Sequence, residues 1–418
     1  MSPESEADLP GGAVLPGALP EELRAELVAF RRDLHMHPEL GNQEFRTTAA
    51  IKDRLVRAGL KPRVLPVGTG LVCDIGVGAG EREAGERDGG PRVLALRADI
   101  DALPIPDTKS DCPYRSTVPD RAHACGHDVH TTVVLGAGLV LAELHRQGLL
   151  PRPVRLVFQP AEEVLPGGAG DAIEGGALDG VQRILALHCD PRVDAGRIGL
   201  REGAITSACD RLEISLDGPG GHTARPHLTT DLVTAAARVV TDAPALITRR
   251  VDSRSGLALT WGRIESGHAP NVIPQHAELA GTVRCLDLDT WRQAPDVVVA
   301  AIDEVANLHR AKSEITYVRG VPPVVNEASS TELLRRAMVA RRGTESVEGT
   351  EQSLGGEDFS WYLEQVPGAM ARLGVRPPGE RGVRDLHQGD FDVDEHAITV
   401  GVELFTAAAL LDDHTAAR

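Results

Sequence analysis

The stretch His123-Ala-Cys-Gly-His-Asp-Val-His130 brings three histidines, a cysteine and an aspartate into eight residues. It leads directly into an apolar segment with helical periodicity over 128–147, and a strand pattern follows over 154–158. A further strand pattern over 183–188 comes after a glycine-rich stretch. Strands that alternate with helices predict an α/β domain, in which polar residues at strand ends form the functional site.

The segment 209–319 has a different pattern. Its strand and helix signals follow one another in the order β-α-β-β-α-β, which is that of the ferredoxin-like unit. Because α/β patterns resume afterwards, we expect one discontinuous domain over 21–208 and 320–418, interrupted by an inserted α+β domain. Residues 1–20 are acidic and contain several prolines and glycines, which predicts a flexible leader.

Composition narrows the classes of protein that the chain can belong to. Its 418 residues exceed one ordinary domain. The net charge of −17 argues against nucleic acid or an anionic membrane surface as a partner. The longest apolar run has about ten residues, whereas a membrane span needs ~20. The six cysteines are scattered and no secretory signal opens the chain, which favours a cytoplasmic protein with reduced thiols.

Cys125 and His127 are candidate metal ligands. Cysteine and histidine are the side chains that zinc and similar metals prefer, and on an extended turn both residues can point into one site. Gly126 would relieve crowding between them. Asp128 would then cap the following helix or hold a histidine ring. The alternative is a cysteine that merely packs beside histidines at the start of a helix.

A second candidate motif, Phe158-Gln-Pro-Ala-Glu-Glu163, follows a strand directly. Two adjacent carboxylates are costly to bury together, because each raises the pKa of the other. A metal ion removes that conflict if one glutamate binds it and the other serves as general base toward a metal-activated water. The alternative is a solvated pair of glutamates on a loop.

Three other polar positions are weak signals in isolation. His188 ends a strand pattern, where a histidine is usually structural, and His387 lies in Leu386-His-Gln-Gly-Asp-Phe391. Asp99 and Asp101 alternate at another strand end, where an aspartate would orient a metal ligand or form a turn.

Taken together, these segments resemble the M20 metallopeptidase/amidohydrolase family. The similar branch contains hippurate hydrolases, N-acyl-amino-acid amidohydrolases and plant auxin-conjugate hydrolases. The motifs occur in the family's order: RADIDALP (97–104), HACGHDVH (123–130), FQPAEE (158–163), ALH (186–188), GGHTARPH (220–227), NVIP (271–274), GGEDF (355–359) and LHQGDF (386–391).

The resemblance implies a zinc-peptidase-like catalytic domain with an inserted ferredoxin-like lid that mediates dimerisation, and hence a homodimer. It also implies two divalent metal ions, either zinc, manganese, cobalt or nickel. The implied ligands are Cys125, His127, Glu163, His188 and His387, with Asp99 and Asp128 supporting them. Much of the wider family has histidine where this chain has Arg97, and a bridging aspartate where it has Cys125.

The same resemblance suggests the catalytic and substrate-binding residues. Glu162 would be the general base. His222 would reach the active site of the partner subunit and stabilise the oxyanion, unless it only caps a helix. Asn271 would bind the carboxylate of the substrate, unless it only shapes a turn, and Arg284 is a weaker candidate for that carboxylate.

The expected reaction is therefore hydrolysis of an N-acyl amino acid to a carboxylic acid and a free amino acid. One alternative is a dipeptidase or carboxypeptidase of the same superfamily, and another is a non-catalytic metal-binding protein on the same fold. Other common chemistries lack support, because the sequence contains neither a G-x-S-x-G nucleophile motif nor a GxxxxGK[ST] phosphate loop.

Overall fold

The computed structural model describes residues 17–76 and 93–411, and the chain divides into two compact units. The first unit is built from Met1–Gly203, Asn326–Glu351 and Trp361–Arg418, and the second from Ala204–Val325 and Gln352–Ser360. The second unit is therefore wider than the predicted insertion over 209–319. Most of the predicted leader, residues 1–16, lies outside the described residues.

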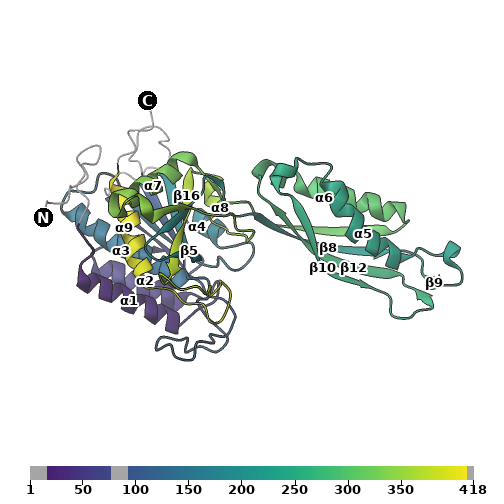
Figure 1. Ribbon diagram of the computed structural model, residues 1–418, viewed down its shortest axis with the longest axis horizontal. Coiled ribbons are helices and arrows are strands. Elements are labelled where there is room, and N and C mark those ends of the chain that lie inside the picture. The colour runs from purple at the N-terminus through teal and green to yellow at the C-terminus, as the bar shows by residue number, and fades with distance from the viewer. Residues whose placement is uncertain (1–16, 77–92, 412–418) are drawn as a thin grey trace. The chain divides into compact units, whose positions relative to one another are not determined.

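The first unit is built around an eight-stranded mixed sheet with the order β1-β2-β4-β3-β5-β16-β6-β15 (Figure 1). The four neighbouring strands β4, β3, β5 and β16 are parallel, as expected for an α/β domain. The strands are β1 (Arg63–Val64), β2 (Leu71–Ile75), β3 (Val93–Asp99), β4 (Val154–Gln159), β5 (Val181–Asp194), β6 (Ile198–Leu200), β15 (Val347–Gly349) and β16 (Gly368–Arg376).

Helices pack against this sheet and against each other. Helix α3 contacts α1, α2, α9 and strand β3, while α7 contacts α9 and strand β16 (Figure 1). Helix α9 carries a single acidic residue, Glu403, and is buried at nearly every position, as a helix with apolar residues on all sides must be. The helices are α1 (Glu21–Met36), α2 (Phe45–Arg57), α3 (His127–Arg146), α4 (Ala169–Glu174), α7 (Ala328–Arg342) and α9 (His396–Leu410).

The second unit contains a four-stranded antiparallel sheet with the order β10-β12-β8-β13. Its elements follow the chain as β-α-β-β-α-β, which is the order predicted for 209–319. They are β8 (Ala208–Asp217), α5 (Leu232–Ile247), β10 (Ala258–Ser266), β12 (His276–Cys285), α6 (Leu288–Leu308) and β13 (Lys312–Val321), with a separate pair of short strands, β9 (Gly221–His222) and β11 (Val272–Ile273).

Three short elements lie where the chain passes from one unit to the other. These are β7 (Gly203–Ala204), β14 (Val325–Asn326) and α8 (Ser360–Leu363). None of the helices in the described part of the chain is long and apolar enough to cross a membrane. The six cysteines, all of them within the described residues, form no disulfide bond.

Candidate metal centre

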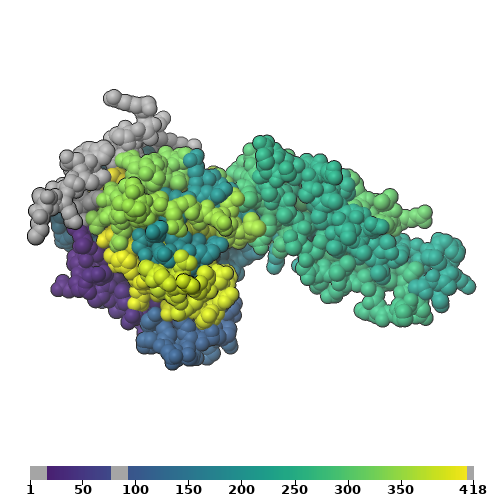
Figure 2. All heavy atoms as spheres, viewed as in Figure 1, coloured from purple at the N-terminus to yellow at the C-terminus, as the bar shows by residue number. Residues whose placement is uncertain are grey.

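The sheet of the first unit brings the five predicted ligands into one region. Cys125 precedes helix α3 and His127 is its first residue. Glu163 follows β4, and His188 lies within β5. His387 belongs to the mostly exposed segment before α9, and Figure 2 shows chain from this last part of the sequence, in yellow, at the surface of the first unit. Glu163 and His188 converge because β4 and β5 flank β3 in the sheet, and the start of α3 and the segment before α9 bring the other three predicted ligands beside them.

The donor atoms form two overlapping groups. Those of Cys125, His127 and His188 all lie within 4.8 Å of one another, and so do those of Cys125, Glu163 and His387. The Cys125 sulfur lies 3.6 Å from Nε2 of His188, and Nε2 of His387 lies 3.4 Å from Oε1 of Glu163. The sulfur of Cys125 is therefore a donor atom that the two groups have in common.

The chemistry of these groups fits a divalent metal. Cys125, His127 and His188 are buried. Nε2 of His127 is buried without a hydrogen-bond partner among the described residues, and its nearest carboxylate oxygens, on Glu163 and Glu162, are 3.8 and 3.9 Å away. An unpartnered buried nitrogen costs ~1–3 kcal/mol. A bound ion would satisfy it, and a set of thiol, imidazole and carboxylate donors suits zinc-like metals.

Two of the candidate ligand histidines are held by their second ring nitrogen. Nδ1 of His127 lies 3.2 Å from Oδ1 of Asp101, and Nδ1 of His188 lies 2.8 Å from the backbone oxygen of Cys189. Each arrangement fixes the ring so that its Nε2 faces the other donors. The other oxygen of Asp101 accepts a hydrogen bond from the backbone nitrogen of Glu163 at 3.0 Å. Asp101 thus contacts two of the candidate ligands, His127 and Glu163, directly.

His130, the third histidine of the motif, uses both ring nitrogens for hydrogen bonds. Nδ1 lies 2.6 Å from Oδ1 of Asp99, and Nε2 accepts a hydrogen bond from the backbone nitrogen of Cys189 at 2.8 Å. It therefore supports the strand position next to His188 instead of offering a nitrogen to a metal. Asp99 contributes through this bond, and its Oδ1 lies 3.8 Å from Nδ1 of His127.

The electrostatics of the cluster favour the binding of a cation. Burial would lower the pKa of His127, but the carboxylates of Asp99 and Asp101 raise it to about 10. Burial raises the pKa of the Cys125 thiol well above its usual value, and Glu163 raises it further. Because thiolate and neutral imidazole are the ligating forms, binding of a divalent cation here would be coupled to the release of protons.

Two predicted residues of the second unit lie close together. His222 and Asn271 are exposed, on or next to the paired short strands β9 and β11. Nδ1 of His222 accepts a hydrogen bond from the backbone nitrogen of Ala224 at 3.0 Å, and the backbone oxygen of Asn271 accepts one from Thr223 at 3.2 Å. The third residue, Arg284, lies in β12 and donates to the backbone oxygen of Leu354 at 2.9 Å.

Comparison with known proteins decides the family. The model of the peptidase family M20/M25/M40 matches residues 95–411. The chain belongs to this family. A Bacillus subtilis relative named N-acetyl-L-cysteine deacetylase is 38% identical over 376 residues, which are 90% of this chain and 85% of that protein. The family assignment places the chain among amide-cleaving hydrolases.

A Rhodococcus jostii relative named glutamate–cysteine ligase 2-3 is 47% identical over 390 residues, or 93% of this chain. The chain spans about half of that relative, 47% of its length. Among solved structures, a Bacillus subtilis protein described as a dinuclear metal-binding peptidase of the M20 family superposes with a TM-score of 0.79. It is 32% identical, and the match covers 94% of this chain and 98% of the other. The fold is therefore that of M20 peptidases.

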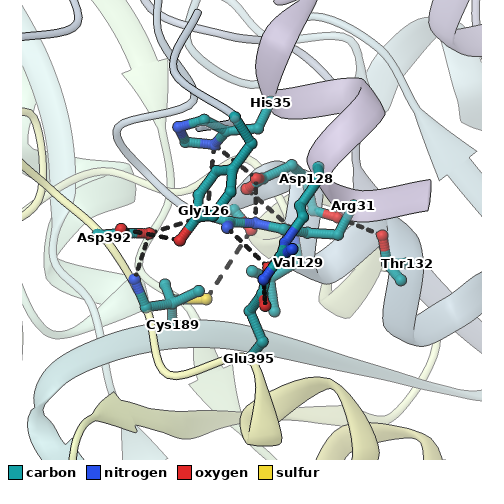
Figure 3. A network of polar contacts seen from close by, with 12 residues as sticks. Arg31, His35, Gly126, Asp128, Val129, Thr132, Cys189, Asp392 and Glu395 are labelled. Carbon is teal, nitrogen blue, oxygen red and sulfur yellow. Dashed lines mark hydrogen bonds and ion pairs between the residues drawn. The ribbon is translucent and has the colours of Figure 1, made fainter. Parts of the chain in front are cut away.

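The M20 motif residue Asp128 is not the N-cap of α3, which is Gly126 in the left-handed region at φ 87°. A Cβ at Gly126 would lie 2.6 Å from the sulfur of Cys189, so only glycine fits. The Asp128 carboxylate instead contacts two side chains of helix α1. Nε of Arg31 lies 2.7 Å from its Oδ2 in an ion pair, and Nδ1 of His35 lies 2.8 Å from the same oxygen (Figure 3). Asp128 does hold a histidine ring, but that of His35.

Replacement of Arg31 by methionine is expected to lower the free energy of unfolding by ~3–5 kcal/mol. Its side chain and that of Asp128 are fully buried, so the substitution deprives a buried carboxylate of its guanidinium partner and leaves it the ring of His35. Arg32 is the matched control, because its side chain is 43% exposed and pairs with Glu395 at 2.6 Å. Arg32→Met should cost ~1 kcal/mol or less. Equal losses in urea denaturation would contradict this assignment.

Two residues that support the candidate site are not among the predicted site residues. Asp101 is, with Asp99, one of two alternating acids at a strand end, but only Asp99 is predicted as a supporting residue. Glu44 gave no signal at all. It lies directly before α2, is fully buried, and accepts a hydrogen bond from the backbone nitrogen of Ala161 at 2.7 Å. Only the folded chain brings it beside the motif that carries Glu162.

Proposed function

We propose that the protein is a metal-dependent amidohydrolase that cleaves the amide bond of an N-acyl amino acid. The observation that carries this proposal is the pair of overlapping donor groups sharing Cys125, with Glu162 beside them. The deacetylase name of the Bacillus subtilis relative points to the same class of substrate. The residues that would hold two divalent ions, zinc, manganese, cobalt or nickel, are Cys125, His127, Glu163, His188 and His387.

When bound, the metal ions would lower the pKa of a water molecule and polarise the scissile carbonyl. Glu162 supplies the proton transfers. Its Oε2 lies 3.9 Å from Nε2 of His127 and its side chain is 10% exposed, so the carboxylate faces the donor groups and is still accessible to a small substrate. The carboxylate takes the proton of the attacking water and then donates it to the departing nitrogen, which leaves as an amine.

Residues of the second unit complete the proposed site. His222 would stabilise the oxyanion of the tetrahedral intermediate in the active site of a partner subunit, within a homodimer. Asn271 would bind the carboxylate of the substrate, with Arg284 as a further candidate. Each residue type suits its task, because an imidazole, an amide and a guanidinium all donate hydrogen bonds to oxygen anions. We place the enzyme in the cytoplasm, as its scattered cysteines suggest.

The test is hydrolysis of a panel of N-acetyl and N-benzoyl amino acids and dipeptides by enzyme of defined metal content. We expect release of the free amino acid from N-acyl amino acids, faster than from dipeptides. A clear preference for dipeptides would instead support a dipeptidase of the same family. If the metal-loaded enzyme hydrolyses none of these amides, the proposed function is wrong.

A further inference from the structure

Glu44 is a buried carboxylate that the proposed mechanism does not use. Its exposure is 0%, and burial raises its pKa to about 7. Burying a carboxyl group is costly unless its oxygens are hydrogen-bonded. One of these oxygens, Oε1, accepts the hydrogen bond from the backbone nitrogen of Ala161. Glu44 therefore connects the start of helix α2 with the residue directly before Glu162.

The backbone at Ala161 has an unusual conformation. Its φ of 56° lies in the left-handed region, which few residues other than glycine adopt. Such a conformation costs ~1–3 kcal/mol and persists only where the surroundings impose it. The direction of the Glu162 side chain depends on this peptide, because Ala161 sets the path of the chain as it leaves β4.

Three contacts hold this turn. The first is the bond from Ala161 to Glu44. In the second, the backbone oxygen of Ala161 accepts a hydrogen bond from the backbone nitrogen of Gly168 at 3.0 Å. Residue 168 must be glycine for this approach, because a Cβ there would lie 2.0 Å from the backbone oxygen of Pro160. The third is the bond from the backbone nitrogen of Glu163 to Asp101. The backbone on both sides of Glu162 is thus fixed by carboxylates from other parts of the chain.

We propose that Glu44 is a positioning residue, which holds the Ala161 peptide so that the Glu162 carboxylate points at the metal centre. This inference rests on the proposed function, in which Glu162 is the general base. What Glu44 contributes is a hydrogen-bond acceptor at a fixed reach. A neutral acceptor of the same length should therefore replace it, and a shorter carboxylate should not.

The experiment compares Glu44→Gln with Glu44→Asp in the full-length, metal-loaded enzyme. Glutamine keeps an oxygen at the position of Oε1, whereas aspartate keeps the charge but is one methylene shorter. We expect Glu44→Gln to stay within about 3-fold of the wild-type kcat. We expect Glu44→Asp to lose about 10- to 100-fold in kcat, since a displacement of ~1 Å can cost that much. KM and metal content should change little in both.

Thr48→Val is the matched control on the same helix. Thr48 is also buried, and its Oγ1 accepts a backbone hydrogen bond from Gly70 at 2.8 Å. The control thus removes a comparable side-chain-to-backbone bond that does not reach Ala161. It should lower the melting temperature but leave kcat within about 3-fold. If Glu44→Gln loses as much kcat as Glu44→Asp, or if Thr48→Val does, the proposed role of Glu44 is wrong.

Hydrogen–deuterium exchange of the peptide that carries Ala161 separates this inference from the proposed function. Exchange there should be faster in Glu44→Asp than in the wild type, and unchanged in Thr48→Val and Glu44→Gln. Unchanged exchange in Glu44→Asp would overturn the positioning role. If the wild-type enzyme hydrolyses no amide at all, the proposed function fails, while the exchange data still decide whether Glu44 holds the turn.

Discussion

Replacing Glu162 by glutamine is expected to lower kcat by about 10²- to 10⁴-fold, which is the usual contribution of a general acid–base residue. Glutamine has nearly the same size, so the packing around residue 162 should be preserved. It cannot take a proton from water or deliver one to the leaving nitrogen. Steady-state kinetics with an N-acyl amino acid, together with the metal content of the same sample, would measure the effect.

The neighbouring substitution Glu163→Gln is the matched control. The same chemical change one residue further along removes a proposed ligand, because Glu163 shares a donor group with Cys125 and His387. We expect Glu162→Gln to keep the metal and lose turnover, and Glu163→Gln to lose metal. Near-normal turnover of metal-loaded Glu162→Gln would rule out its role as the base. A loss of turnover that only follows a loss of metal would do the same.

Much of the fold could be predicted because its signals are local. Helical periodicity gave α3 over 128–147 where the structure has His127–Arg146, and the second unit has the predicted β-α-β-β-α-β order. The motif at 123–130 is so rich in potentially ligating side chains that it indicated where a candidate metal centre would lie. Residues after β4 and within β5 converge there because these strands flank β3.

The central strand β16 (Gly368–Arg376) escaped prediction for a physical reason. Every residue from Gly368 to Val375 is buried, so the strand shows no alternation of polar and apolar side chains. It is also rich in alanine and glycine, which have low β-propensity. This segment adopts the β conformation because it pairs in parallel with β5 along most of its length. Such pairing is invisible in the sequence.

The contacts that support the ligands were also beyond the reach of sequence patterns. Glu44 and Ala161 are 117 residues apart, and Asp128 meets His35 across 93. Their pairing depends on how α1 and α2 pack against the rest of the unit, which no local motif encodes. The candidate ligands could therefore be named from sequence, whereas the contacts that hold them in place required the folded chain.

Substitution of Cys125 by serine tests the most specific feature of the centre, the thiol that belongs to both donor groups. A serine hydroxyl stays protonated near neutral pH and is a poor zinc ligand. The affinity for both ions should therefore fall by at least about 100-fold, which is more than the loss of a residue that only supports a ligand costs. Zinc should then raise the melting temperature of the variant much less than that of the wild type.

The single-group substitutions His188→Asn and His387→Asn provide the comparison for Cys125→Ser. Each substitution removes a donor from only one of the two groups. After dialysis against a weak chelator, each of these variants should therefore retain close to one ion, whereas Cys125→Ser should retain neither. The order of metal contents thus reports the sharing of the sulfur independently of activity. If Cys125→Ser binds two ions as tightly as the wild type, the thiol is not a ligand, and the two donor groups are separate sites without a common atom.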